Sequence, residues 1–251
     1  MLKKIKDKLY FIKRWWQMIF CYPQDHIIAE ADYDAYWTKR GEDKQKAKAP
    51  LLNSAQKKRA EIIAEIIKED GERKVSILDV GCGDGELLHY LSSMVKADKI
   101  IGVDGSPRAL ELAKKLGILG IEMNVNNKES IEKLPPSDFV LLLEVLEHLP
   151  NTEEVLRASF KIAARGVFFS FPNSGYFLFR LRLLFGRFPM QWRVHPGEHL
   201  RFWTVGDTRW WLKALQYENY DLRCYRGIPL LGKPFPSLFA EGILVYLPKK
   251  Q

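Results

Sequence analysis

Short apolar runs alternate with helical patterns through most of the chain. Five runs of β-branched and aromatic residues predict strands at positions 75–80, 99–104, 118–125, 139–143 and 167–171. Between them, apolar positions recur at helical spacing in residues 86–95, 107–116 and 152–164. The second of these helices opens on Ser106-Pro107, a capping residue followed by a first-turn proline. Alternating strands and helices indicate an α/β fold with a doubly wound, mostly parallel, Rossmann-like sheet.

The pattern changes after the fifth strand. Residues 174–200 form an insertion rich in aromatic and basic side chains, which we expect to build one side of a binding site. Beyond it, the sequence predicts a helix over 205–216 capped by Thr204, and strands near 220–226 and 243–247.

The chain has the size of one domain with additions. With 251 residues, 47% of them hydrophobic, it can bury one full-sized core. Residues 43–50 are charged and poor in large apolar side chains, which predicts a linker. The sequence therefore divides into an N-terminal helical extension at 1–50 and a core domain at 51–251.

The net charge of +8 is concentrated in two segments that also carry bulky apolar side chains. In residues 2–20, apolar side chains follow helical spacing, and lysine and arginine take most of the other faces, which is typical of helices that bind at a membrane surface. Residues 177–188 combine arginine with bulky apolar side chains in the same way. Three alternatives stay open for both segments: contact with a membrane or lipid, packing on the domain, and contact with nucleic acid. The pattern favours nucleic acid least.

Cysteine usage and the length of the apolar runs predict a cytoplasmic protein, either soluble or peripheral to the membrane. The three cysteines, at positions 21, 82 and 224, form no metal-ligand spacing and indicate a reducing compartment. The longest apolar runs are strand-sized, too short to span a bilayer, and the N-terminus lacks the continuous core of a signal peptide. The oligomeric state does not follow from the sequence.

Three alternating glycines follow the first predicted strand. Gly81, Gly83 and Gly85 stand where the strand gives way to a helix, and Asp104 ends the next strand. Glycine lets the backbone pass close to a ligand, and the helix that begins near Asp84 points free N–H groups at the same place. A carboxylate at the tip of the following strand can accept both hydroxyls of a ribose. The spacing therefore predicts a nucleoside-binding crevice.

The acidic rim of this loop selects the kind of nucleoside. Where a diphosphate-binding loop has its third glycine, this chain has Glu86, which would repel a diphosphate, and there is no lysine of a phosphate-binding loop. Together with Asp79 and Asp84, Glu86 suits a ligand with an ammonium and a sulfonium group, and S-adenosylmethionine has both. The segment 78–85 followed by Asp104 resembles motif I and the acidic strand end of class I S-adenosylmethionine-dependent methyltransferases.

The resemblance extends from about Ser54 to Pro248. Residues 137–150, which end in Glu144-Val145-Leu146-Glu147-His148-Leu149-Pro150, look like the family's fourth strand and its E-x-x-E-H-L segment. Residues 165–173 resemble the fifth strand, and their Pro-Asn end is similar to the branch that includes MetW-like proteins. The resemblance implies seven strands with the last one antiparallel.

The resemblance also implies a set of cofactor-binding residues, namely Asp79, Gly81, Cys82, Gly83, Asp104, Gly105, Asn126 and Glu144. One position departs from the family. Where the third strand usually ends on an aspartate that accepts from the adenine amino group, this chain offers Asn124, Asn126 and Asn127. An amide oxygen can accept the same hydrogen bond, so the sequence leaves the choice among the three open.

The candidate catalytic residues are Glu147, His148 and His199. Two carboxylates and a histidine at the end of the fourth strand can serve as a general base or hold a divalent cation. Similar residues bind a metal in O-methyltransferases of ubiquinone biosynthesis and of small-RNA 3′ ends, which would make Glu144, Glu147, His148 and His199 the ligands. Three alternatives stay open: a metal site, a metal-free base or substrate contact at His148, and purely structural roles. The metal-free alternative is favoured, since the segment is also widespread in relatives without a metal.

These residues predict a methyltransferase that uses S-adenosylmethionine and acts on oxygen of an amphipathic or lipid-like small molecule, because transfer to a neutral hydroxyl needs a base. Two alternatives are a MetW-like S-adenosylmethionine-binding accessory protein with little transfer of its own, and an RNA methyltransferase. The acceptor itself is not predicted, because the insertion that would build its pocket matches no chemical motif.

Overall fold

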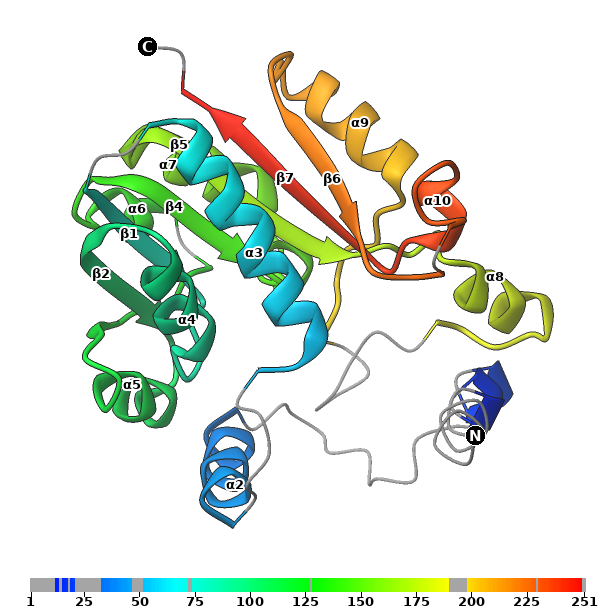
Figure 1. The fold of residues 1–251 in the computed structure, drawn as a ribbon, viewed down its shortest axis with the longest axis horizontal. Coiled ribbons are helices and arrows are strands. Elements are labelled where there is room, and N and C mark those ends of the chain that lie inside the picture. The colour runs from blue at the N-terminus through cyan, green and yellow to red at the C-terminus, as the bar shows by residue number, and fades with distance from the viewer. Residues whose placement is uncertain are drawn as a thin grey trace.

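A seven-stranded mixed sheet forms the centre of the molecule (Figure 1). The computed structural model describes residues 12–13, 15–17, 19–20, 33–46, 52–71, 74–126, 128–189, 198–228 and 230–249. The strands are β1 (Val75–Val80), β2 (Ala97–Asp104), β3 (Leu119–Glu122), β4 (Ser137–Leu143), β5 (Ala163–Pro172), β6 (Asp221–Tyr225) and β7 (Gly242–Pro248). Their order is β3-β2-β1-β4-β5-β7-β6, and among these described strands β7 runs in the direction opposite to all the others, pairing antiparallel with β5 and β6. The predicted seven-stranded, doubly wound fold is confirmed.

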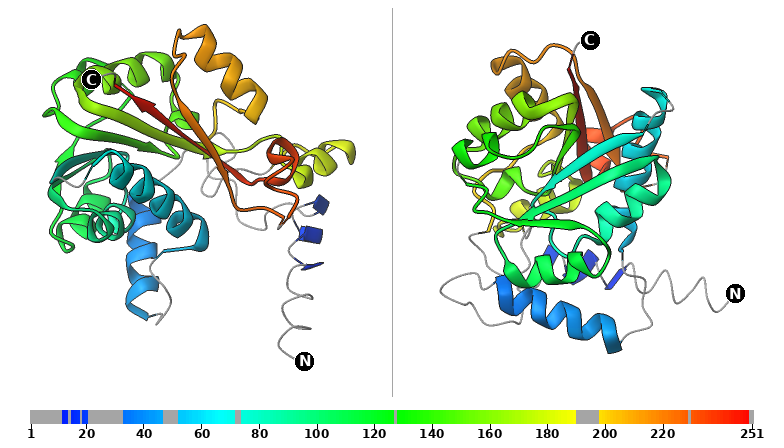
Figure 2. Two further views of the ribbon diagram at one scale, coloured as in Figure 1. Left: turned by 45° about the horizontal axis from the view of Figure 1, so that its top comes forward. Right: turned by 90° about the vertical axis from the view of Figure 1, so that its left-hand side faces the viewer.

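Helices cover both faces of the sheet (Figure 2). One face carries α3 (Ser54–Glu69), α4 (Glu86–Met94) and α5 (Pro107–Lys114), and buried side chains of these helices join one apolar core. The other face carries α6 (Lys128–Glu132), α7 (Thr152–Ile162) and α9 (Val205–Ala214), which contribute to a second core. The central strands are buried on both sides, and this explains why they read as continuous apolar runs.

Capping side chains fix where several helices begin. Ser106 accepts a hydrogen bond from Ala109 N at the start of α5, and Pro107 occupies the first turn. Thr204 and Asp207 form a reciprocal capping box at α9. Both caps are therefore confirmed. A third capping box, between Asn53 and Gln56, starts α3.

Several predicted boundaries differ from the observed ones by a few residues, as at β5, which begins at Ala163, and two differences have a clear physical cause. β3 covers only Leu119–Glu122, because this outermost strand is largely exposed and the apolar residues after it leave the sheet. The helix α2 (Tyr33–Lys46) continues through residues 43–46, which the sequence analysis assigned to a linker. Those residues lack large apolar side chains, but three of the four, Lys44, Gln45 and Lys46, are good helix formers. Residues 47–50 lie outside the described part of the chain.

The insertion after β5 and the segment before β7 extend from one end of the molecule. The insertion contains α8 (Phe177–Leu184), and α10 (Pro236–Phe239) precedes β7. The described residues between 12 and 20 are helical and lie beside α8 (Figures 1 and 2). Residues 190–197 and most of 2–20 are outside the described residues, so the predicted amphipathic helix is described only in part. Among the described helices, none is both long and apolar enough to cross a membrane.

Candidate active site

The glycine loop connects β1 to α4 and requires glycine at its turns. Gly81 and Gly83 adopt left-handed backbone angles, with φ of 79° and 54°. A Cβ atom on Gly81 would lie 2.5 Å from Val145 Cγ2, and one on Gly83 would lie 2.5 Å from Trp37 Cη2. Glycine is therefore needed both for the backbone conformation and for the space that neighbouring side chains occupy.

Cys82 turns its side chain away from the centre of this loop. A Cβ atom on Gly102 of β2 would lie 2.6 Å from Cys82 Sγ, so the thiol packs on the neighbouring strand. Backbone N–H groups of Gly81 and Cys82 donate to Val103 O, which fastens the loop to β2. The Cys82 carbonyl in turn accepts from Gly85 N, so both backbone groups of Cys82 have partners, and its role in cofactor binding stays a prediction.

Asp104 joins the glycine loop to the start of α5. Its Oδ2 accepts from Gly83 N at 2.8 Å, and its Oδ1 accepts from Ser106 N at 2.9 Å. Burial raises the pKa of Asp104, although these backbone donors oppose the rise. Each carboxylate oxygen has a second lone pair, so Asp104 can still accept hydroxyl groups. Its position at the carboxyl end of β2 is the one the sequence predicted for a ribose-binding acid.

The helix α2 covers the glycine loop. The Trp37 ring lies against Gly83, as shown by the short approach to a Cβ atom built there. Arg40 Nε donates to Asp84 Oδ2 at 2.8 Å, and the guanidinium group lies 5.5 Å from the centroid of the Trp37 ring. Asp34 accepts from Ser106 Oγ. The helix α2 therefore packs directly on the glycine loop and is fastened to it by an ion pair.

Asp79 is a buried acid beneath the loop. Its Oδ1 has no hydrogen-bond partner among the described residues. Burial raises the pKa of Asp79 to about 7, an effect that the nearby Arg59 opposes and Asp104 reinforces.

We expect Asp79→Asn to stabilise the fold in mildly alkaline buffer. The pKa of an aspartate in an unfolded chain is about 3.9. Between that pH and about 7, Asp79 therefore keeps its proton in the folded chain and loses it in the unfolded chain. Stability is then lost with rising pH at about 1.4 kcal/mol per pH unit within this window, and asparagine removes that loss. Urea unfolding at pH 5 and pH 8 measures the difference. Parallel pH dependence in the wild type and the variant would contradict a raised pKa at Asp79.

Glu144 belongs to a buried polar network. Its backbone is left-handed, with φ of 58°, directly after β4. Glu144 Oε1 lies 2.8 Å from Arg59 Nη1 and accepts from Ser170 Oγ at 3.0 Å, while Tyr225 OH lies 3.5 Å away. Arg59 Nη1 also donates to Ser170 Oγ at 2.7 Å. Arg59 is thus the buried cation that faces the acids at this end of the sheet.

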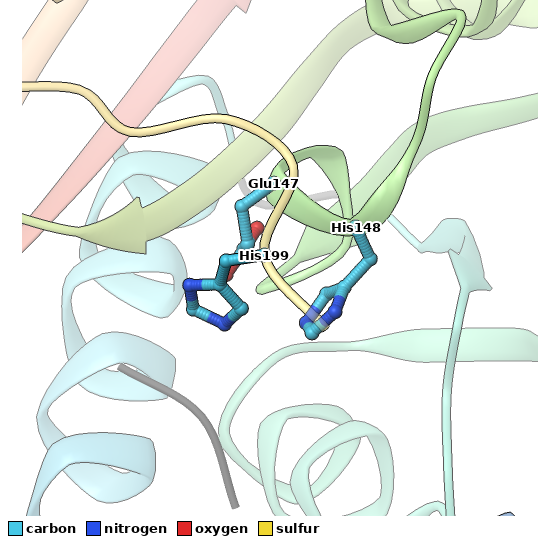
Figure 3. A group of neighbouring side chains, drawn as sticks. All are labelled: Glu147, His148 and His199. Atoms are coloured by element: carbon cyan, nitrogen blue, oxygen red, sulfur yellow. The ribbon is translucent and has the colours of Figure 1, made fainter. Parts of the chain in front are cut away.

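Glu147, His148 and His199 come together into one cluster (Figure 3). One potential ligand atom from each side chain lies within 4.8 Å of the other two. Glu147 and His148 lie on the 3-10 turn η1 (Leu146–His148), and His199 comes from the segment that follows the insertion. The two imidazole rings meet edge to face with their centroids 4.6 Å apart. Glu144, the fourth residue of the predicted metal set, is not part of this cluster; its carboxylate pairs with Arg59 instead.

Backbone hydrogen bonds hold His199 against the turn. Glu147 O accepts from Leu200 N at 2.7 Å and from Arg201 N at 3.2 Å. The ring nitrogen Nδ1 of His148 lies 2.8 Å from Glu198 O, so this nitrogen carries the proton and donates it. Thr152 Oγ1 donates to Leu146 O and Leu149 O and closes the turn from the other side. The cluster therefore sits on a fixed backbone.

Burial controls the protonation of the cluster. It raises the pKa of Glu147 well above the usual range, and Glu144 adds to this effect. It lowers the pKa of His148, and together with the neighbouring His148 it lowers the pKa of His199 to about 3. Both imidazoles are thus neutral near pH 7, which is the form that accepts a proton or binds a metal.

The same cluster has the donor set of a divalent-cation site. Both carboxylate oxygens of Glu147 and Nδ1 of His199 are buried and have no hydrogen-bond partner among the described residues. The carbonyl of Glu198 occupies Nδ1 of His148 and leaves Nε2 as the free ligand atom, the usual arrangement of a metal-binding histidine. Two neutral imidazoles and a carboxylate therefore fit a cation at this place.

The sequence singled out most, but not all, of the residues that gather here. Gly105 and Asn126 are exposed after the ends of β2 and β3, and their assignment to the cofactor stays a prediction. Asn127 is outside the described residues.

The sequence did not single out Arg59. A signal existed, because Arg59 shares the buried face of α3 with Ile63 and Ile66 and is a charged residue in an apolar stripe.

Comparison with known proteins identifies the class. Residues 43–222 match the methyltransferase domain family, so the chain belongs to that family. With its glycine loop, its acidic strand end and its sheet order, it is a class I S-adenosylmethionine-dependent methyltransferase.

Its relatives include ubiquinone biosynthesis O-methyltransferases. The protein from Dechloromonas aromatica (strain RCB) is 30% identical over 185 residues, which cover 70% of this chain and 77% of that protein. The protein from Alkalilimnicola ehrlichii (strain ATCC BAA-1101 / DSM 17681 / MLHE-1) is 31% identical over 160 residues, which cover 59% of this chain and 60% of that protein. The similarity thus leaves a substantial part of both relatives unmatched.

Solved structures share the fold. The small RNA methyltransferase HEN1 superposes with a TM-score of 0.59 at 21% identity, covering 82% of this chain and 27% of that chain. Magnesium protoporphyrin IX methyltransferase (ChlM) from Synechocystis PCC 6803, with bound SAH, superposes with a TM-score of 0.56 at 15% identity, covering 87% of this chain and 96% of that chain. At these identities the superpositions establish the common architecture alone.

Proposed function

We propose that this methyltransferase transfers the methyl group to a hydroxyl oxygen of an amphipathic or lipid-like small molecule. The supporting observation is the cluster of the buried Glu147 with the half-buried His148 and His199 at the carboxyl end of β4. A neutral hydroxyl has to lose its proton as its oxygen is methylated, and this cluster supplies neutral imidazoles for that purpose. The ubiquinone biosynthesis O-methyltransferases among its relatives bear a name that agrees with transfer to oxygen.

The roles of the residues follow from their positions. S-adenosylmethionine supplies a methyl group bonded to a positively charged sulfur. Asp104 and the glycine loop orient the nucleoside, and Asp79 contributes negative charge beneath the loop once it is ionised. The imidazole of His148 takes the hydroxyl proton at Nε2 while the acceptor oxygen attacks in line with the breaking bond to sulfur, and His199, whose lowered pKa makes it a poor base, positions the acceptor beside it.

A divalent cation is a second way for the cluster to act. Glu147, His148 Nε2 and His199 would hold it, as the unpartnered buried atoms indicate. A cation bound there would polarise the acceptor oxygen and lower the pKa of its proton.

The approach to the cluster is lined with aromatic rings. The centroid of the His199 ring lies 6.3 Å from that of Phe202, and the Phe202 and Phe188 rings meet edge to face at 5.2 Å. Phe188 and Phe202 are both exposed, so this series of rings leads from the surface to His199. An apolar acceptor with a polar hydroxyl end would suit it, because the rings bind the body and the cluster binds the hydroxyl.

Paired acceptors can test the choice of oxygen. We expect methyl transfer to an alkyl catechol and little or none to the matching alkyl aniline, because the cluster can deprotonate a phenolic hydroxyl to a strong oxygen nucleophile but cannot activate the much less acidic aniline nitrogen in this way. Each reaction is run with EDTA, and then with manganese or magnesium restored. If EDTA abolishes transfer and the restored metal ion recovers it, the cluster acts through a bound cation. If EDTA leaves transfer unchanged, an imidazole acts as the base without a metal. Methylation of the amine alone would contradict the proposed function.

A further inference from the structure

Three segments that are far apart in sequence meet at one end of the molecule. They are the described residues between 12 and 20, residues 177–188 with α8, and the described residues between 228 and 239 with α10. Figures 1 and 2 show them together beyond the carboxyl end of β5. We call these three segments the apolar end.

Direct contacts join the three segments. The Trp15 and Phe177 rings meet edge to face at 5.3 Å, and Arg182 Nη1 donates to Ile19 O at 3.3 Å. On the other side, the Phe177 and Phe239 rings lie 5.8 Å apart. The buried Asn173 at the end of β5 donates to Pro236 O, Ser237 O and Ala240 O, which fixes the turn before β7. The apolar end is thus one assembled surface rather than three independent loops.

Large apolar side chains of this surface point into solvent. Leu184 is 76% exposed and Leu230 is 91% exposed, and Trp16, Phe185 and Phe235 are exposed as well. Leu230 also has a left-handed backbone, with φ of 68°, where a leucine is unfavourable. Its side chain gains no packing in return within the described residues. A strained turn that presents a leucine outward points to a partner that receives the side chain.

The charge of the apolar end selects the kind of partner. The chain contains 31 Asp and Glu residues, but residues 12–20, 177–188 and 228–239 contain none. They do contain lysine and arginine in each segment, with Lys13, Arg180 and Lys233 exposed. Bulky apolar and aromatic side chains among cations, without acids, are what an anionic bilayer surface binds.

We infer that the apolar end docks on anionic membrane surfaces, with the turn around Leu230 and Phe235 as a contact beside the described residues between 12 and 20 and residues 177–188. The inference deepens the proposed function and rests on it for the nature of the acceptor: Phe188 belongs to the apolar end and also to the series of rings that leads to His199. A lipid-like acceptor could then reach the cluster from the bilayer.

Vesicle flotation of the full chain tests this inference. The probes are phosphatidylcholine vesicles with and without phosphatidylglycerol, at low salt. We expect the wild type to bind the anionic vesicles. The double variant L230S/F235S should bind them at least about tenfold more weakly, because two apolar side chains are removed from the interface. Lys233→Gln should reduce binding to anionic vesicles by about fivefold and leave binding to neutral vesicles unchanged.

Leu119→Ser is the matched control. Leu119 is also exposed, but it lies on β3 at the opposite edge of the sheet, so its loss should leave vesicle binding unchanged. Equal binding of the wild type and L230S/F235S, or no binding by the wild type, would overturn the inference. Transfer to a short-chain, water-soluble alkyl catechol is measured on the same preparations. Loss of vesicle binding with transfer retained supports the inference, whereas vesicle binding without transfer by the wild type would leave the docking surface in place and contradict the proposed function.

Discussion

Replacing Asp104 with alanine is expected to weaken S-adenosylmethionine binding by about 2–4 kcal/mol. Asp104 stands at the carboxyl end of β2, and its two carboxylate oxygens already hold Gly83 N and Ser106 N in place. The substitution removes the charge-assisted acceptor for the ribose hydroxyls and also releases the loop that approaches the nucleoside. Titration calorimetry with S-adenosylmethionine measures the loss.

A carboxylate on the same strand provides the control. Asp98 also lies on β2 but is exposed and away from the loop, so Asp98→Ala should bind the cofactor as the wild type does. Thermal unfolding of both variants separates loss of binding from loss of fold. Unchanged affinity in Asp104→Ala, or binding of a nicotinamide dinucleotide by the wild type, would contradict the assigned nucleoside site.

Replacing Glu147 with glutamine or His199 with alanine is expected to lower kcat by about 10²- to 10⁴-fold and to leave cofactor affinity nearly unchanged. The cluster lies at the carboxyl end of β4, and either substitution removes a group that would position the acceptor beside His148 or hold a cation. The backbone that carries the cluster should survive, because its hydrogen bonds run through Glu147 O and the amides of Leu200 and Arg201.

His89→Ala is the matched control for histidine loss. His89 lies exposed on α4, outside the cluster, and its removal should leave kcat unchanged. Wild-type kcat in both Glu147→Gln and His199→Ala would give the cluster a purely structural role, which is one of the alternatives that the sequence left open.

The sequence was most informative where local chemistry dictates structure. The glycines at 81 and 83 predicted a loop that only glycine can form, and the structure confirms left-handed backbone at both. Ser106 and Thr204 predicted helix starts, because capping depends on residues only three positions apart. The sequence also proposed His199 as a partner of Glu147 and His148, and the structure brings the three together.

Contacts between distant segments were harder to predict. Arg59 pairs with Glu144 and Ser170 only because α3 packs across the ends of β4 and β5, and a single charged residue in a helix carries no mark of such a partner. Leu230 and Phe235 stand among prolines and glycines, where no periodicity separates a buried apolar residue from an exposed one. The helical state of residues 43–46 was missed because they were judged by their apolar content and not by their helix propensity.

Transfer of a labelled methyl group tests the central claim most directly. The full chain is incubated with methyl-tritiated S-adenosylmethionine and a total bacterial lipid extract, in parallel with total RNA, and the label is counted in the organic and the acid-insoluble fractions. The account predicts label in the organic fraction as a base-stable ether, and its loss in Glu147→Gln with cofactor binding intact. Label in RNA alone, or no label in either fraction from a protein that binds the cofactor, would contradict it.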